Sequence, residues 1–229
     1  MDADLAAWAG RRVVGVFPHP DDEAWAAGGL LARAAAAGAE VHLVSVTAGE
    51  AGTNRGGADG PIAVVRAAEL RAAAAALGAA AVHVLGLPDG GLATASFDAV
   101  AACLERLGPA VVVALGDDGG YGHADHVALT RALRALVPAS TPLWLAAFPP
   151  GLFEPVRAGL ARRRPELCAD VRLGVAQPTF ELALTADERR RKLLAIRAHR
   201  SQLPGGDALR FLGPGVVARL IEREGWVVR

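Results

Sequence analysis

Two short segments of the chain combine histidine and carboxylate side chains at spacings that suit metal chemistry. The first is residues 18–23, Pro-His-Pro-Asp-Asp-Glu, in which His19 and Asp22 are three residues apart. The second is residues 122–126, Gly-His-Ala-Asp-His, in which two histidines are again three residues apart. Three consecutive acidic side chains repel one another unless a cation or hydrogen-bond donors neutralise them, and a divalent metal does this well.

Taken alone, the first segment has a simpler interpretation. An aspartate at the N-cap with a glutamate in the first turn is an ordinary beginning for a helix. The second segment favours a metal, because a catalytic zinc ion needs three protein ligands and one open position for water. His19, Asp22 and His126 supply two imidazoles and one carboxylate. We therefore expect these three residues to bind the metal.

The remaining residues of the two segments offer proton-transfer chemistry. Asp21 would be an unbound carboxylate beside the metal, suited to accept a proton from a metal-activated water. His123 would stabilise a developing oxyanion or protonate a leaving amine, and Asp125 would bond His123 and raise its basicity. These roles predict metal-assisted hydrolysis. His42 and His83 lie inside predicted strands, and we interpret them as structural.

Around these residues the chain alternates between predicted strands and helices. Short, uniformly apolar strands are predicted at 12–17, 40–47, 81–85, 110–115 and 143–148. Helices are predicted between them at 24–37, 62–77, 96–107 and 125–136. Uniformly apolar strands are typical of sheets that helices cover on both faces. The pattern predicts an α/β fold with a doubly wound, mostly parallel, Rossmann-like sheet.

This order of elements would bring the reactive segments together. In an open parallel sheet, ligands bind beyond the carboxyl ends of the strands. Residues 18–23 follow the first predicted strand, a glycine-rich loop at 49–60 follows the second, and residues 116–126 follow the fourth. We expect all three to line one crevice, with the glycine-rich loop as a lid that carries Glu50 and Asn54 at the mouth.

The length favours one domain over residues 1–229. We expect its parallel core over about 11–148 and a less regular part over about 149–229. In that second part the pattern predicts only a strand at 179–184 and a helix from Thr185 to about Arg200.

Composition excludes several classes of function. The 24 basic and 24 acidic residues balance and form no basic stripe, so we expect no nucleic-acid partner. No apolar run reaches about 18 residues, so we expect no membrane span. Residues 1–10 lack a basic segment followed by an apolar run, so we expect no signal peptide. Cys103 and Cys168 form no CxxC pair, which indicates two reduced thiols in a cytoplasmic protein.

The two metal motifs resemble the signatures of the PIG-L, or LmbE-like, family of zinc-dependent N-acetylglucosaminyl deacetylases. The family's first signature, [A/S/P]-H-P-D-D-E, matches residues 18–23. Its second, G-H-x-D-H, matches residues 122–126, with Ala124 where proline is usual. The resemblance implies the same zinc ligands as above, a general base at Asp21 and an acid or oxyanion partner at His123. Iron(II) is the alternative metal, because the ligand set tolerates both.

Three further elements resemble the family, and they extend the similarity over nearly the whole chain. Arg66-x-x-Glu69 resembles a helix whose arginine contacts the sugar, and residues 87–90 resemble an acidic substrate loop that contains Asp89. Residues 199–202 resemble an H-x-S-Q element, in which we expect His199 to support the site without binding metal.

The substrate contacts keep their alternatives at this point. Arg66 could instead pair with Glu69 on a helix surface. Asp89 lies in a turn, where aspartate is common for backbone reasons. Tyr121, the only tyrosine, could bond the tetrahedral oxygen or simply pack its ring.

The expected activity is removal of an acetyl or other acyl group from the amine of an N-acetylglucosamine-type sugar conjugate. One alternative is an amidase or deacylase that acts on another natural product or on a thiol conjugate. A non-haem iron oxygenase shares the two-histidine, one-carboxylate triad, but Asp21 and the α/β pattern speak against it. A non-catalytic Rossmann-like binding module lacks support, because an acidic loop replaces G-x-G-x-x-G after the first strand. Relatives in this family are often oligomeric, and the sequence leaves the choice between a monomer and a homo-oligomer open.

Overall fold

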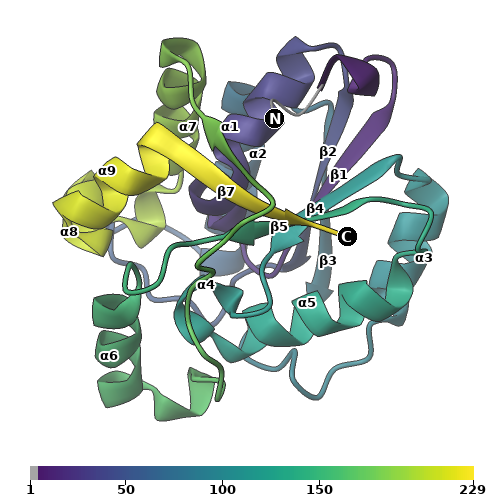
Figure 1. The fold of residues 1–229 in the computed structure, drawn as a ribbon. Coiled ribbons are helices and arrows are strands. Elements are labelled where there is room, and N and C mark those ends of the chain that lie inside the picture. The colour runs from purple at the N-terminus through teal and green to yellow at the C-terminus, as the bar shows by residue number, and fades with distance from the viewer. Residues whose placement is uncertain (1–4) are drawn as a thin grey trace.

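A seven-stranded sheet forms the centre of the molecule, and the computed structural model describes it within residues 5–229 (Figure 1). The strands are β1 (Arg12–Phe17), β2 (Glu40–Thr47), β3 (Ala81–Leu87), β4 (Val111–Leu115), β5 (Leu143–Ala147), β6 (Phe180–Ala183) and β7 (Arg223–Val228). Their order in the sheet is β3-β2-β1-β4-β5-β7-β6. The first five pair in parallel, whereas β7 runs antiparallel to both β5 and β6.

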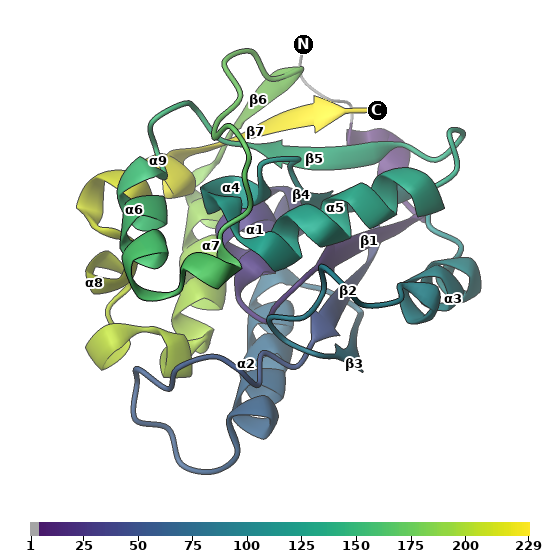
Figure 2. The same cartoon turned by 90° about the horizontal axis from the view of Figure 1, so that it is seen from below.

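Helices cover both faces of this sheet, as Figures 1 and 2 show. The helices are α1 (Asp22–Ala36), α2 (Ile62–Leu77), α3 (Asp98–Leu107), α4 (Gly119–Gly122), α5 (Ala124–Leu136), α6 (Glu154–Arg163), α7 (Ala186–Ala198), α8 (Ala208–Leu212) and α9 (Pro214–Glu222). Buried residues of α1, α2, α7 and α9 share one core with the sheet. Buried residues of α3 and α5 share the second core on the opposite face.

Alternate residues of β1 enter the two cores. Val13 and Phe17 belong to the core under α1, and Val14 and Val16 belong to the core under α5. Successive side chains of a strand point to opposite faces, so a strand buried on both faces must be apolar at every position. This confirms the predicted doubly wound α/β arrangement and explains why the strands lack an alternating pattern.

The last third of the chain holds more regular structure than the sequence pattern predicts. The strand β7 was missed, and it lies between β5 and the predicted strand β6. Helix α6 was missed as well, and none of its residues is buried, so it carries no apolar periodicity that could reveal it. Residues 149–229 therefore contribute an antiparallel edge to the same sheet.

A buried ion pair ties this C-terminal part to α1. Lys192 of α7 is fully buried, and its Nζ atom lies 2.6 Å from Oε1 of Glu224 in β7. The Glu224 carboxylate also accepts the backbone N–H groups of Gly29 and Leu30 in α1, each at 2.8 Å. A Cβ atom at Gly29 would collide with Leu184. Glycine at this position therefore lets Leu184 and Glu224 approach the backbone of α1 closely.

Three expectations from the sequence concern membrane spans, the two cysteines and a signal peptide. Within residues 5–229, every helix is too short or too polar to cross a bilayer. Both cysteines, Cys103 and Cys168, carry free thiols. The expected absence of a signal peptide concerns residues 1–10, of which the first four lie outside the described residues.

Replacing Glu224 by alanine should lower the free energy of unfolding by about 3–5 kcal/mol, because it leaves the Lys192 ammonium buried and unpaired. Urea denaturation measures the change. The double variant Lys192→Met, Glu224→Leu should recover part of the loss, since no buried charge remains. The control is Glu166→Ala, which breaks the exposed pair with Arg164 and should cost less than about 1 kcal/mol. Equal losses for Glu224→Ala and Glu166→Ala would contradict the prediction.

Candidate metal centre and active site

Three side-chain atoms from separate elements converge at the carboxyl ends of β1 and β4. His19 Nδ1 lies 3.3 Å from Asp22 Oδ2 and 3.2 Å from His126 Nε2, and the latter two atoms are 3.4 Å apart. A tetrahedral ion with ligand bonds of about 2.0–2.2 Å places its ligand atoms about 3.3–3.6 Å from one another. The three atoms therefore fit one metal ion, as the spacing of the two motifs predicts.

A fourth donor lies close to this triangle. One ring nitrogen of His123 lies within 4.8 Å of ring nitrogens of His19 and His126. The Asp22 oxygen completes a set in which every pair of atoms is 3.2–3.4 Å apart. His123 lies beside this set and is not part of it.

The loop after β4 positions His126 through a close backbone approach. Gly119 adopts φ +60°, and a Cβ atom there would lie 2.7 Å from Cβ of His126. The Gly119 carbonyl accepts a hydrogen bond from Nδ1 of His126 at 3.0 Å. Because Nδ1 carries the proton, the lone pair of Nε2 faces the other two ligand atoms. The loop is closed by Asp118, whose carboxylate accepts the N–H groups of Gly120 and Gly174.

The Asp125 side chain orients His19. The prediction that it would bond His123 is therefore wrong. His19 Nε2 donates to Asp125 Oδ2 at 3.2 Å, which leaves Nδ1 free for the metal. The Asp125 carboxylate also accepts the N–H groups of Gly90 and Leu92. His123 meets only the backbone of Asp125, because its Nδ1 atom caps α5 by accepting the Asp125 N–H at 3.2 Å. The cap directs the carboxylate away from His123 and toward the turn after β3.

The site concentrates negative charge. His19 contacts the carboxylates of Asp22, Asp89 and Asp125. Burial favours its neutral form, but these carboxylates outweigh burial and raise the pKa of His19 well above its ordinary value. Burial likewise opposes ionisation of Asp22, yet His126 and His19 hold its pKa well below the usual range. Such a cluster is what a divalent cation neutralises.

Asp21 stands apart from the ligand set. Burial raises its pKa to about 6, although the Arg66 guanidinium opposes this. Arg66 Nη2 lies 3.2 Å from Asp21 Oδ1. The carboxylate therefore stays ionised at neutral pH and has more basic character than an exposed aspartate.

Arg66 is buried against the loop that carries Asp21. It is only 3% exposed, and it donates to the carbonyl oxygens of Gly49 and Pro20 as well as to Asp21. The alternative of a surface pair with Glu69 is wrong, because Glu69 accepts the backbone N–H and the hydroxyl of Ser201, each at 2.7 Å. The sugar contact expected for Arg66 stays a prediction.

The other two expected substrate residues also lie at the centre. Tyr121 packs edge-on against His126, with ring centroids 5.1 Å apart, so it is a packed ring that borders the site. Burial and nearby carboxylates raise its pKa, which keeps the phenol protonated. Asp89 Oδ1 lies 3.0 Å from His19 Nε2, so this turn residue contacts the ring nitrogen of His19 that lies opposite the ligand triangle. Substrate contacts by Tyr121 and Asp89 stay predictions.

The glycine-rich loop after β2 is held by hydrogen bonds at its start and in its middle. Asp89 Oδ2 accepts the N–H of Ala51, and Glu50 accepts the N–H of Asp89. The N–H groups of Arg55 and Gly56 donate to the Ser201 carbonyl. Asn54, expected at the mouth, bonds Ala58 within the loop itself. These contacts tie the loop to the site and to the C-terminal part.

Sequence reasoning did not assign a role to Glu23 beyond the acidic run. Glu23 is 1% exposed, and its Oε1 atom lies 2.6 Å from His199 Nε2. Burial disfavours a charged imidazole, but Glu23 outweighs it and raises the pKa of His199. His199 therefore contacts the metal-binding segment without joining the ligand triangle. His42 and His83 bond each other on β2 and β3, at 3.1 Å, as structural residues.

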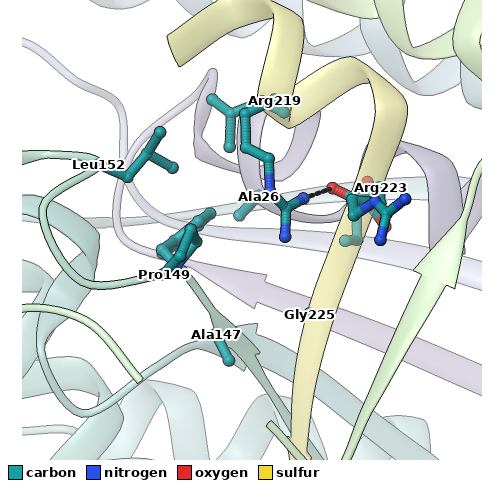
Figure 3. A pocket seen from close by; sticks show the side chains of 10 residues that line it. Ala26, Ala147, Pro149, Leu152, Arg219, Arg223 and Gly225 are labelled. Carbon is teal, nitrogen blue, oxygen red and sulfur yellow. Dashed lines mark hydrogen bonds between the residues drawn. The ribbon is translucent and has the colours of Figure 1, made fainter. Parts of the chain in front are cut away.

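Two cavities lie away from the ligand triangle. One, of about 10 Å³, holds a single water at most and is lined by Glu224, Pro149 and Leu152 among others. Figure 3 shows this cavity, with Arg219 donating to the Arg223 carbonyl at 2.9 Å. The other, of about 430 Å³, runs behind the loop after β4. Neither is lined by a ligand residue.

Comparison with known proteins bears on this geometry. The GlcNAc-PI de-N-acetylase (PIG-L) family model matches residues 14–137. A 1D-myo-inositol 2-acetamido-2-deoxy-alpha-D-glucopyranoside deacetylase from Mycobacterium sp. (strain KMS) is 38% identical over 164 residues, which are 60% of this chain and 53% of the relative. An enzyme of the same name from Nakamurella multipartita is 36% identical over 210 residues, or 77% of this chain and 68% of the relative.

The same comparison extends to solved structures. The conserved protein TT1542 from Thermus thermophilus superposes with a TM-score of 0.66 at 27% identity, and the match covers 95% of this chain and 94% of that one. The chain spans about half the length of the mycobacterial relative. The family match covers both metal motifs. The chain belongs to the PIG-L family.

Proposed function

We propose that this protein is a metal-dependent deacetylase that removes an acetyl or other acyl group from the amine of an N-acetylglucosamine-type sugar conjugate. The observation that carries the proposal is the triangle of His19, Asp22 and His126, with its unbound neighbours Asp21 and His123. The family description and the names of the relatives point to the same amide bond.

The donor set supports zinc, with iron(II) as the alternative. Two imidazole nitrogens and one carboxylate oxygen suit either ion, and the separations of 3.2–3.4 Å match a tetrahedral site. When bound, such an ion lowers the pKa of a water molecule and polarises the acyl carbonyl. We also infer that residues 1–229 act as one domain and that the two free thiols, Cys103 and Cys168, belong to a cytoplasmic protein.

Asp21 is the general base in this proposal. Its carboxylate belongs to none of the contacts that form the ligand triangle, and its pKa of about 6 keeps it ionised near neutral pH. A base with a pKa close to the working pH combines the correct protonation state with useful basicity. The Arg66 contact at 3.2 Å fixes one carboxylate oxygen and leaves the other available for the proton.

His123 acts as a hydrogen-bond donor to the developing oxyanion. Burial and the neighbouring histidines lower its pKa to about 3, so the ring is neutral at working pH. Its Nδ1 atom accepts the Asp125 N–H, so the proton of the neutral ring resides on Nε2. Of the two roles open from sequence, this tautomer favours oxyanion stabilisation over protonation of the amine.

Substrate recognition is assigned to Asp89, Tyr121 and Arg66, on the family resemblance and on their place around the centre. The ligand is a small acylated amino-sugar conjugate. The second candidate is an amidase or deacylase of another natural product, because the same centre serves any accessible amide. A non-catalytic binding module is not favoured, because it assigns no function to the Asp21 and His123 side chains beside the ligand triangle.

Purified protein should contain about one zinc or iron ion per chain, and Asp22→Ala should lose it, because one of three ligands is missing. Asp125→Asn should weaken metal affinity about 10–100-fold, since His19 Nε2 loses one of the two carboxylates that orient it. Elemental analysis and chelator competition measure both effects. The control Asp117→Ala removes an exposed carboxylate paired with Arg134 and should keep the metal. Full metal retention by Asp22→Ala would refute the ligand assignment.

Asp21→Ala should retain the metal and lose turnover by about 10²–10⁴-fold, because the proton acceptor is gone. The assay is release of free amine from a panel of N-acetylglucosamine conjugates. Activity confined to amides without a sugar would favour the second candidate. An Asp21→Ala variant with wild-type turnover would show that Asp21 is not the base.

A further inference from the structure

The backbone of Asp21 is held in a conformation that an L-residue avoids. Its dihedral angles are φ +120° and ψ −29°, and among the described residues no other non-glycine position has positive φ. Such a conformation costs about 1–3 kcal/mol and persists only where the surrounding structure imposes it. The contacts of Asp21 should therefore reveal what holds it.

Every polar group of Asp21 has a partner. Its N–H donates to Glu23 Oε2 at 3.0 Å. Its carbonyl accepts the N–H groups of Ala24 and Trp25 at 3.1 and 3.2 Å, which begins α1. Its carboxylate accepts from Arg66. The contact to Glu23 is the unusual one, because a side chain two residues ahead binds the backbone of the strained residue itself.

Glu23 is in turn held from the far end of the chain. Its second oxygen, Oε1, lies 2.6 Å from His199 Nε2, and both side chains are 1% exposed. His199 follows the last residue of α7, and two residues later Ser201 donates its N–H and its hydroxyl to Glu69 of α2. The segment 199–202 is thus fixed to α2 while it presents His199 to Glu23.

We propose that Glu23 and His199 are positioning residues, which hold the backbone of Asp21 at positive φ and so aim its carboxylate at the reacting water. The proposal rests on the proposed function, in which Asp21 is the base. It also makes His199, which lies outside the matched range 14–137, part of the catalytic apparatus. His199 directs its Nε2 atom to Glu23 and not to the ligand triangle, so it influences Asp21 through Glu23.

The metal ligand next to Asp21 is held by different contacts. Asp22 Oδ2 accepts the backbone N–H of His19 at 3.0 Å and contacts both ligand imidazoles. Without its partner His199, the buried Glu23 carboxylate would lose the contact that fixes its orientation, it would turn, and the N–H of Asp21 would lose its acceptor. The backbone of Asp21 would then relax, while Asp22 would stay in place. Loss of the base and loss of the metal are therefore separable.

The decisive pair of variants is His199→Phe and His199→Gln. Phenylalanine fills the same space without a donor, whereas the glutamine amide nitrogen can take the place of Nε2. His199→Phe should lower kcat about 10–100-fold, with KM changed by less than about 2-fold and metal content unchanged. His199→Gln should restore kcat to within about 5-fold of wild type. His83→Phe, which removes a hydrogen-bonded histidine at the far edge of the sheet, should leave kcat unchanged.

Two results would overturn the proposal. The first is a His199→Phe enzyme with wild-type kcat. The second is a His199→Phe enzyme that loses metal and activity together, because that outcome indicates a general structural role. If His199→Phe does not fold, Glu23→Leu replaces it. Leucine has no oxygen to accept the Asp21 N–H, so kcat should fall with metal retained, and an unchanged kcat would overturn the proposal.

A crystal structure of His199→Phe gives a readout that needs no turnover. Asp21 should leave positive φ, whereas Asp22 should keep its contacts with His19 and His126. An unchanged Asp21 backbone refutes the positioning role. If the wild-type enzyme hydrolyses no amide of the panel, the proposed function fails, and this structure still decides whether the Glu23–His199 pair holds Asp21.

Discussion

Crowding of carboxylates around His19 is the constraint on which the rest of the site depends. Asp22, Asp89 and Asp125 all contact this one buried imidazole beyond the carboxyl end of the central strand β1. Like charges at such distances are tolerable only if a cation or several donors neutralise them. The Rossmann-like sheet meets this demand where its parallel strands end, because there loops from β1, β3 and β4 bring histidines and backbone N–H groups to the same point.

Each donor is oriented by a second contact, and this determines which atom faces the centre. The Gly119 carbonyl accepts a hydrogen bond from Nδ1 of His126, and the Asp125 carboxylate accepts one from Nε2 of His19. The backbone of Asp125 occupies Nδ1 of His123. His19 and His123 are thus protonated on Nε2, and His126 is protonated on Nδ1. His19 and His126 each present an unprotonated nitrogen to the ligand triangle and suit a ligand role, whereas His123 suits a donor role.

The C-terminal part completes the site rather than merely enclosing it. Glu224 of β7 and Lys192 of α7 fix the middle of α1. His199 and Ser201 fix the beginning of α1 and the helix α2 through Glu23 and Glu69. Because α1 begins next to Asp21, these contacts link the packing of the last third of the chain to the Asp21 carboxylate.

The sequence by itself determined the strand–helix order and the two metal motifs, and it predicted distinct jobs for Asp21 and Asp22, because hydrophobic periodicity and ligand spacing are local properties. It could not determine that Asp125 bonds His19, because these residues are 106 positions apart and meet only when β1 lies beside β4. Nor could it determine that His199 bonds Glu23, because these residues are 176 positions apart and meet only when α7 lies against α1. Strand β7 was hidden for the same reason: its partners are distant in sequence, and an antiparallel edge forms only once β5 is in place.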